Sequence, residues 1–368
     1  MKVLYIGYYK ENSEWGKMAT NFILSMHAAG IEVVPRAIEL SPGREVGGLI
    51  AQLEKGDVED CDVCIQHVFP DHFVGSEKFK KNIAIFTNDF IEIAHTSAVE
   101  KLNLATEVWV ANEDSKNVLS EVLSVPVSVV HPGFRAEIYK QAYEKVELGS
   151  EVDDSFRFYT VANSVPERDN IISTFHGEFD VSEPVSLIIF STSPDADFSK
   201  KLNALSQEVK TKLRIKQSPE MFKPDAIVHM PQASEKDIYA LHQYAHCYVS
   251  SSQGDAWPVT AYDAACFGNT PIMASAGGIK EFSDCRFLVP SVTSVSLSTG
   301  NVSELRNGRD YIITPCHKSI RAAMRLAYEN YKDNPVQSQQ ARKVEGLQIA
   351  DRFSLEQSGN RIKELLNV

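Results

Sequence analysis

The sequence predicts an α/β protein with two doubly wound domains, on the basis of three observations. Short, continuous apolar runs recur along the chain, and each is followed by polar loop residues and a helical segment. The 368 residues are enough for two domains, since one domain usually takes about 100–200 residues. A polar, charged stretch at residues 136–154 divides the runs into two sets, as an interdomain linker would. Strands that are apolar throughout indicate sheets covered by helices on both faces.

The first set opens with a strand, a helix and a second strand, which predicts a parallel sheet. Residues 18–26 carry apolar side chains at helical spacing, and Gly30 is typical of a helix C-cap. Asn112 is expected to cap a later helix. Strands are expected at residues 3–6, 31–34, 63–65, 83–86, 108–110 and 127–130.

The second set begins at Phe156, and residues 354–366 carry an apolar stripe that predicts a final amphipathic helix. In doubly wound sheets, ligands bind beyond the carboxyl ends of the strands. Two such domains facing each other would therefore form a cleft for a substrate. Strands of the second set are expected at residues 158–161, 187–190, 226–230, 247–249 and 270–273.

Composition excludes several classes of function. The formal net charge of −12 argues against a nucleic-acid-binding protein, although a local basic pocket for one nucleotide remains compatible with it. Cys61 and Cys64 form a CxxC at the start of a strand, whereas a redox pair belongs at a helix N-terminus. The first residues do not resemble a signal peptide, and no apolar stretch approaches the ~18 residues that span a bilayer. We expect a cytoplasmic protein without a transmembrane segment, with weak peripheral membrane contact left open.

The segment at residues 250–272 carries the strongest functional signal. A strand leads into a loop that contains Gly254, a helix is expected to start near Pro258 and to end near Gly268, and another strand follows. A loop that leads into a helix N-terminus presents free N–H groups and a positive dipole end, which suit an anion such as a diphosphate.

This segment resembles the donor site of the retaining glycosyltransferases of family 4. Aligned without gaps, Asp255 and Asp263 fall on the two glutamates of the family's motif, and Gly268 falls on its glycine. Other segments resemble the same family in the expected order, so the resemblance covers nearly the whole chain. They are residues 107–112, 127–139, 234–241 and 276–281.

The resemblance implies the GT-B fold, in which two Rossmann-like domains face each other across a cleft. Residues 1–140 would form the acceptor domain, and residues 155–350 the donor domain, with the C-terminal helix at residues 352–368 packing back on the first. The donor would be a nucleoside-diphosphate sugar, most simply UDP- or GDP-linked, and transfer would retain the anomeric configuration. No metal ion or other cofactor is expected, and the acceptor (a glycan, a lipid or a small molecule) is left open.

The resemblance also implies roles for individual residues. Asp263 would bind the ribose, Asp255 would hold the donor sugar near the reacting carbon, and the loop around Gly254 would serve the phosphates and sugar. Arg168 fits the position of the family's catalytic lysine, whereas Asn163 falls where an arginine is expected. Either another cation supplies the missing charge, or turnover is slow. The remaining donor-loop residues are Ala256, Trp257, Pro258 and Val259, and the cations considered are Lys216 and Lys280.

Three residues of the first domain are candidates for the other wall of the cleft. Gly16 lies in the loop after the first strand, where a glycine allows close backbone approach to a substrate. His67 and Asp89 each follow a strand at its carboxyl end, and His67 could donate to sugar hydroxyls as part of the catalytic set.

Two other functions were weighed. A Rossmann oxidoreductase would need GxGxxG after the first strand, and the loop after Ile6 has no such pattern. A catalytically degenerate nucleotide-sugar-binding protein of the same fold stays open. Each aspartate is one methylene shorter than the family's glutamate, and a misplacement of ~1 Å can cost about 100-fold in rate.

Overall fold

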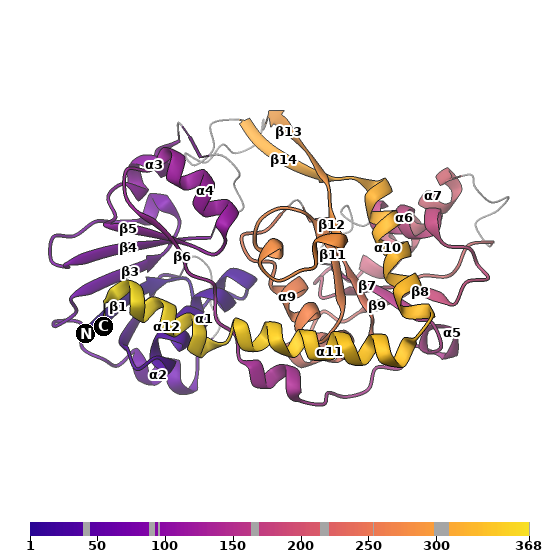
Figure 1. The fold of residues 1–368 in the computed structure, drawn as a ribbon, viewed down its shortest axis with the longest axis horizontal. Coiled ribbons are helices and arrows are strands. Elements are labelled where there is room, and N and C mark those ends of the chain that lie inside the picture. The colour runs from indigo at the N-terminus through magenta and orange to yellow at the C-terminus, as the bar shows by residue number, and fades with distance from the viewer. Residues whose placement is uncertain are drawn as a thin grey trace.

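Two parallel six-stranded sheets form the centres of two lobes that lie side by side (Figure 1). The computed structural model describes residues 1–39, 45–87, 93–94, 96–162, 169–213, 221–252, 254–297 and 309–367. Every strand pair within the two sheets is parallel. The predicted α/β class with two doubly wound sheets is therefore confirmed.

The first sheet has the strand order β2-β1-β3-β4-β5-β6. Asn112 caps α4 as predicted, because its Oδ1 accepts from the backbone N–H of Ser115 at 2.7 Å. The strands are β1 (Lys2–Gly7), β2 (Glu32–Ala37), β3 (Val63–His67), β4 (Lys81–Phe86), β5 (Glu107–Val110) and β6 (Val127–Val129). The helices of this lobe are α1 (Glu14–Ala28), α2 (Gly48–Leu53), η1 (Pro70–His72), α3 (Ser97–Leu102) and α4 (Glu113–Val122).

The second sheet has the order β12-β11-β10-β7-β8-β9, and it follows a linker that contains η2 (Ala136–Lys140) and α5 (Ser150–Asp153). Its strands are β7 (Phe156–Ala162), β8 (Val185–Ser191), β9 (Ala226–His229), β10 (Cys247–Val249), β11 (Thr270–Ala274) and β12 (Leu288–Val289). The helices that connect them are α6 (Asp169–Glu178), α7 (Phe198–Leu213), α8 (Glu235–Tyr244), α9 (Val259–Cys266), η5 (Gly278–Glu281) and η6 (Cys285–Phe287).

Several elements after β12 were not predicted. An antiparallel hairpin of β13 (Ser291–Leu297) and β14 (Arg309–Pro315) projects from the second lobe, and α10 (His317–Lys332) follows it. The long α11 (Pro335–Arg352) runs back toward the first lobe (Figure 1). Only Gly346 and Ala350 of α11 are fully buried, so small residues make its tightest contacts and leave little apolar periodicity in the sequence.

The chain crosses between the lobes at two points that lie against each other. The Phe134 N–H donates to the Phe353 carbonyl at 2.8 Å, and the Leu355 N–H donates to the Phe134 carbonyl at 3.0 Å. The final helix α12 (Leu355–Leu366) then packs on α1, with Ile362 and Leu366 in the core of the first lobe. Both chain ends consequently lie on this lobe (Figure 1).

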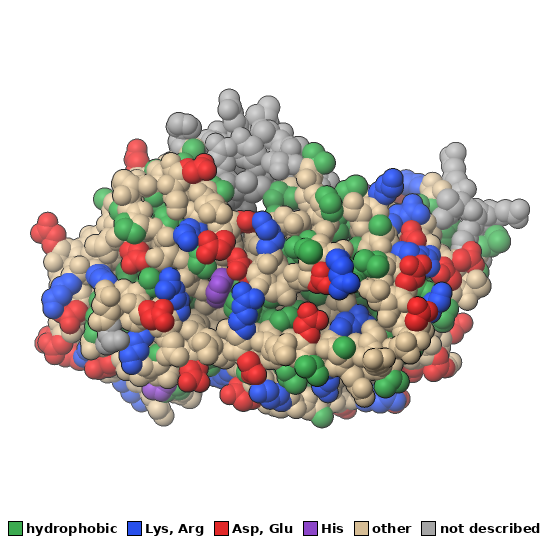
Figure 2. Space-filling view, viewed as in Figure 1, with side chains coloured by type: hydrophobic (Ala, Val, Ile, Leu, Met, Phe, Trp, Pro, Cys, Tyr) green, Lys and Arg blue, Asp and Glu red, His purple; other side chains and the backbone are tan. Residues whose placement is uncertain are grey.

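The surface and the helices add two observations on class of function. Lys and Arg side chains are interspersed with Asp and Glu on the face shown in Figure 2, where no continuous basic area appears. Within the described part of the chain, no helix is both long enough and apolar enough to cross a bilayer.

We predict that Gly359→Ala destabilises the protein. A Cβ at Gly359 would lie 2.1 Å from the Ser25 carbonyl oxygen, so α12 would have to move away from α1. Overpacking of this kind costs about 1–3 kcal/mol, which outweighs the gain in helix propensity of about 1 kcal/mol. The measurement is the midpoint of thermal unfolding. The control is Gly47→Ala, where a Cβ meets nothing within 4 Å; equal midpoints for the two variants would contradict the close packing.

Candidate active site

The predicted donor segment lies at the carboxyl end of β10, and two glycines shape it. Gly254 has φ of 109°, in the region that favours glycine. Asp255 forms an isolated parallel bridge with Gly277, in the turn after β11. A Cβ at Gly277 would lie 2.3 Å from the Asp255 carbonyl oxygen, so only glycine allows this approach. The loop is therefore fixed against the neighbouring turn.

The first domain holds this loop directly. Asn112 Nδ2 donates to the Ala256 carbonyl at 2.7 Å from a buried position, while Asn112 Oδ1 caps α4. Asp114 accepts from the Gly277 N–H at 3.1 Å and from Lys280 Nζ at 2.6 Å. Lys280, one of the cations considered for the leaving diphosphate, is thus engaged in an ion pair at the domain boundary.

The donor loop presents its backbone and one carboxylate, since most of its side chains are buried. Ala256, Trp257, Pro258 and Val259 are all buried. The Trp257 ring packs among His131, Phe353 and other aromatic side chains of the interdomain junction. Asp255 is half-buried, and Ser252 Oγ lies 3.0 Å from both of its carboxylate oxygens, which orients the group.

Asp263 is buried at 3% exposure, and the protein contacts both of its carboxylate oxygens. Tyr139 from the linker donates to Oδ1 at 2.7 Å, and Lys17 Nζ from α1 donates to Oδ2 at 3.2 Å. Lys17 also donates to the Tyr239 hydroxyl at 3.1 Å and lies 3.5 Å from Glu235. The predicted ribose carboxylate is therefore part of a bridge between the two domains and the linker.

Electrostatics keep this bridge charged. Burial lowers the pKa of Lys17, but Asp263, Tyr239 and Glu235 together outweigh burial and raise the pKa overall. Burial, and then the Asp263 charge, raise the pKa of Tyr139, so its hydroxyl stays protonated and donates. The Lys17 ammonium group and the Tyr139 hydroxyl thus both donate to the Asp263 carboxylate.

Gly16 allows Lys17 to reach this position. A Cβ at Gly16 would lie 2.1 Å from the Glu11 carbonyl oxygen, so a side chain there would push α1 away from the preceding loop. Ser13 caps the helix by accepting from the Gly16 N–H at 3.1 Å. Gly16 thus packs closely against its own preceding loop, and its predicted approach to a substrate stays a prediction.

His67 lies at the end of β3 and is fully buried beneath Trp15. Its Nε2 accepts from Trp15 Nε1 at 2.6 Å, so the neutral ring carries its proton on Nδ1, 3.0 Å from the Tyr5 hydroxyl. Burial lowers the pKa of His67 to about 3. His67 is thus placed to position Trp15, whose half-buried ring packs against Tyr8 and Phe69. A direct contact of His67 with a sugar stays a prediction.

Four candidates lie outside the described residues: Asp89, Asn163, Arg168 and Lys216. Across the described ranges, no group of three or more His, Cys, Asp or Glu side chains is arranged to hold a metal ion. Cys61 and Cys64 are buried free thiols, and burial raises the pKa of Cys64 to about 12, which disfavours a reactive thiolate.

Sequence reasoning missed Lys17, Tyr139 and Tyr239 as members of this site. The signal available was the position of Lys17, next to Gly16 in a loop that had been singled out. Nothing in the local pattern indicated that its partner would be Asp263 in the other domain.

No protein-family model matches the sequence, and no curated protein matches it. Solved structures match it in fold over its full length. Anabaena HepE in complex with UDP is 15% identical, with a TM-score of 0.63 and 100% of both chains covered. The trehalose-6-phosphate synthase OtsA is 10% identical, with a TM-score of 0.65 and 100% of this chain and 99% of that chain covered.

A third match is sucrose-phosphate synthase from Thermosynechococcus elongatus, at 12% identity and a TM-score of 0.63, with 100% of this chain and 98% of that chain covered. At these identities the similarity shows the fold. The two parallel sheets and the full-length matches together establish that this chain has the GT-B fold.

We predict that His67 makes stability fall with acidification. Its pKa is about 3 in the folded protein and about 6.5 when unfolded, so the unfolded chain binds more protons between these values. Its contribution to stability is complete above about pH 6.5 and falls by about 1.4 kcal/mol per pH unit below it. Urea unfolding at about pH 7.5 and about pH 5.5 measures the free energy of unfolding. Between these two pH values, His67→Gln should lose less of this free energy than the wild type.

His27→Gln, on the exposed side of α1, is the matched control and should behave as the wild type does. An identical loss of stability in His67→Gln and wild type would show that the His67 ring is protonated, or accessible to protons, in the folded protein.

Proposed function

We propose that this protein is a glycosyltransferase that transfers a sugar from a UDP- or GDP-linked donor to an acceptor, with retention of the anomeric configuration. The observation that carries the proposal is the unit of β10, the Gly254 loop and α9, with Asp255 and Asp263 at the two acidic positions of a glycosyltransferase motif. Proteins of similar fold support it, since HepE structures contain UDP or UDP-glucose.

The backbone at the start of α9 would bind the donor diphosphate, because free N–H groups and the helix dipole favour an anion there. Asp255, oriented by Ser252, would accept hydrogen bonds from hydroxyls of the donor sugar. The leaving phosphate would assist the acceptor's attack on the same face, as retention requires. The acceptor would enter from the first domain, past the aromatic group of Trp15, Tyr8 and Phe69.

Lys17 would supply the positive charge that Asn163 does not provide. Ribose hydroxyls would replace Lys17 at Asp263 Oδ2, while Tyr139 keeps Oδ1. The released ammonium group would then be available to the nearby diphosphate. Lys280 is a weaker candidate for this role because it is paired with Asp114 at 2.6 Å.

We predict different effects for the two aspartates. Asp263→Asn retains an acceptor for Tyr139 but loses the charge, and should weaken donor binding about tenfold or more, since hydrogen bonds to charged groups contribute about 1.5–3 kcal/mol. Asp255→Asn should lower turnover by about 100-fold with little change in donor affinity. Calorimetry with UDP- and GDP-sugars measures donor affinity. Release of free nucleotide in the presence of EDTA measures turnover.

The surface variant Asp62→Asn is the control, because that carboxylate pairs only with the exposed Lys80 among the described residues. If the donor binds but none of the acceptors tried leads to nucleotide release, the protein is a non-catalytic nucleotide-sugar-binding protein. If no nucleotide sugar binds, the proposal is wrong.

We predict that Lys17→Met lowers turnover by about 100-fold, because loss of one preorganised charge donor typically costs this much. Lys17→Arg should keep part of the activity. Glu235→Gln is the matched control: it alters the exposed partner of Lys17, and a rim pair contributes little. Unchanged turnover with tighter donor binding in Lys17→Met would show that Lys17 only holds the unliganded domains together.

A further inference from the structure

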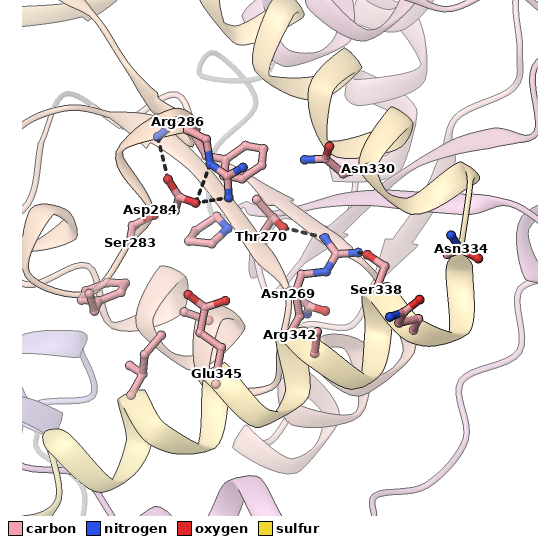
Figure 3. Close-up of a pocket in the computed structure, with 18 residues that line it drawn as sticks. Asn269, Thr270, Ser283, Asp284, Arg286, Asn330, Asn334, Ser338, Arg342 and Glu345 are labelled. Atoms are coloured by element: carbon pink, nitrogen blue, oxygen red, sulfur yellow. Dashed lines mark hydrogen bonds and ion pairs between the residues drawn. The ribbon is translucent and has the colours of Figure 1, made fainter.

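A cavity lies at the amino ends of β11 and β12, where Asn269, Thr270 and Phe287 line it (Figure 3). Its volume is about 420 Å³, within the range of small-molecule sites. Phe282 and Phe287 contribute apolar surface, and amide side chains of α10 and α11 and the turn before α11 surround the opening. The amides are Asn330, Asn334 and Gln337.

Arg342 is the unusual group in this cavity. The side chain is half-buried, and burial lowers its pKa. It donates to two hydroxyls, from Nη1 to Thr270 Oγ1 at 2.7 Å and from Nη2 to Ser338 Oγ at 3.2 Å (Figure 3). No described carboxylate lies within ion-pair distance. A guanidinium has five N–H donors, so most of its donor capacity has no acceptor in the described part of the chain.

Arg157 shows what a satisfied guanidinium looks like in the same domain. It also lacks a carboxylate partner among the described residues, but it donates to the backbone carbonyls of Asp153, Ser155 and Tyr244 at 2.6, 3.2 and 2.8 Å. Arg342 has no such carbonyls. Because Arg342 is half-buried at the cavity, its remaining N–H groups can donate to a molecule bound there.

The other polar groups of the cavity complete the pattern. Arg286 forms an ion pair with Asp284, in which Nε donates to Oδ2 at 2.8 Å. This pairing lowers the pKa of Asp284. Ser283 is among the lining residues, and its Oγ is buried without a hydrogen-bond partner among the described residues. Glu345 is on the exposed side, where water solvates its carboxylate. The groups that face the cavity are therefore the Arg342 guanidinium, the amides at the opening and the solvated Glu345 carboxylate.

We propose that this cavity binds a hydroxylated organic anion of about the size of a sugar phosphate. Its phosphate or carboxylate pairs with Arg342, for which a planar guanidinium offers two parallel N–H donors. Its hydroxyls bond to the amides at the opening. A bare inorganic anion fills only the Arg342 end of the volume. This inference does not depend on the proposed transfer reaction.

The test is calorimetry on the full chain with glucose 6-phosphate, glucuronate, inorganic phosphate and glucose, each with and without saturating UDP. We expect glucose 6-phosphate or glucuronate to bind at least about tenfold more tightly than glucose, since a charge-assisted bidentate pair contributes this much. The tighter of the two identifies phosphate or carboxylate as the bound group. Saturating UDP should leave this binding unchanged.

Arg342→Gln should weaken this binding about tenfold or more, and Arg342→Lys, which retains the charge without the planar fork, should be intermediate. Glu345→Gln should bind at least as tightly as the wild type, because it removes a like charge. The control is Arg321→Gln, an exposed arginine paired with Glu178. The proposal is wrong if glucose binds as tightly as the organic anions, or if neither organic anion binds. It is also wrong if UDP displaces the bound anion, or if Arg342→Lys binds it as tightly as the wild type does.

Discussion

The ion pair between Lys17 and Asp263 constrains much of the rest of the structure, because it joins the two domains at a place that water hardly reaches. The side chains are 21% and 5% exposed, and their charged atoms are 3.2 Å apart. Removing one partner of a buried pair typically costs about 3–5 kcal/mol, since the other charge is left without compensation. The start of α1 and the face of α9 must therefore stay in register, and Gly16 and Tyr139 are fitted around that requirement.

Aromatic side chains seal the junction around the same helix. Phe134 packs on Tyr262 with ring centroids 4.2 Å apart, and Trp257 contacts Phe353 at the end of α11. Because the chain crosses between domains at Phe134 and again at residue 354, α9 lies where both crossings meet. The helix of the donor segment, α9, is thus also a wall of the interdomain core. In the proposed binding mode, the loop backbone and the Asp255 carboxylate contact the donor on that side.

The sequence predicted the two sheets well because their strands are buried on both faces. All seven residues of β8 are buried, and the apolar run at residues 187–190 lies inside it. The hairpin of β13 and β14 escaped prediction because serine and threonine alternate with valine in β13, a pattern outside the continuous runs that marked the other strands. Helix α11 escaped because glycine and alanine, rather than large apolar residues, make its buried contacts.

The position of the candidate site was readable from local pattern, but its internal pairing was not. Lys17 and Asp263 are 246 residues apart, and Trp15 and His67 are 52 apart, so no spacing rule connects them. Sequence reasoning chose candidate cations for the diphosphate by their position along the chain. The structure instead distinguishes them by whether each is already paired with a carboxylate. Lys280 is paired with Asp114 and Lys17 with Asp263, whereas Arg342 donates to two hydroxyls and has no carboxylate partner among the described residues. A ligand at Arg342 would add bonds to open donors. A ribose at Asp263 would instead have to displace the Lys17 ammonium group, so donor binding in the proposed mode requires the Lys17 side chain to move away from Asp263 Oδ2.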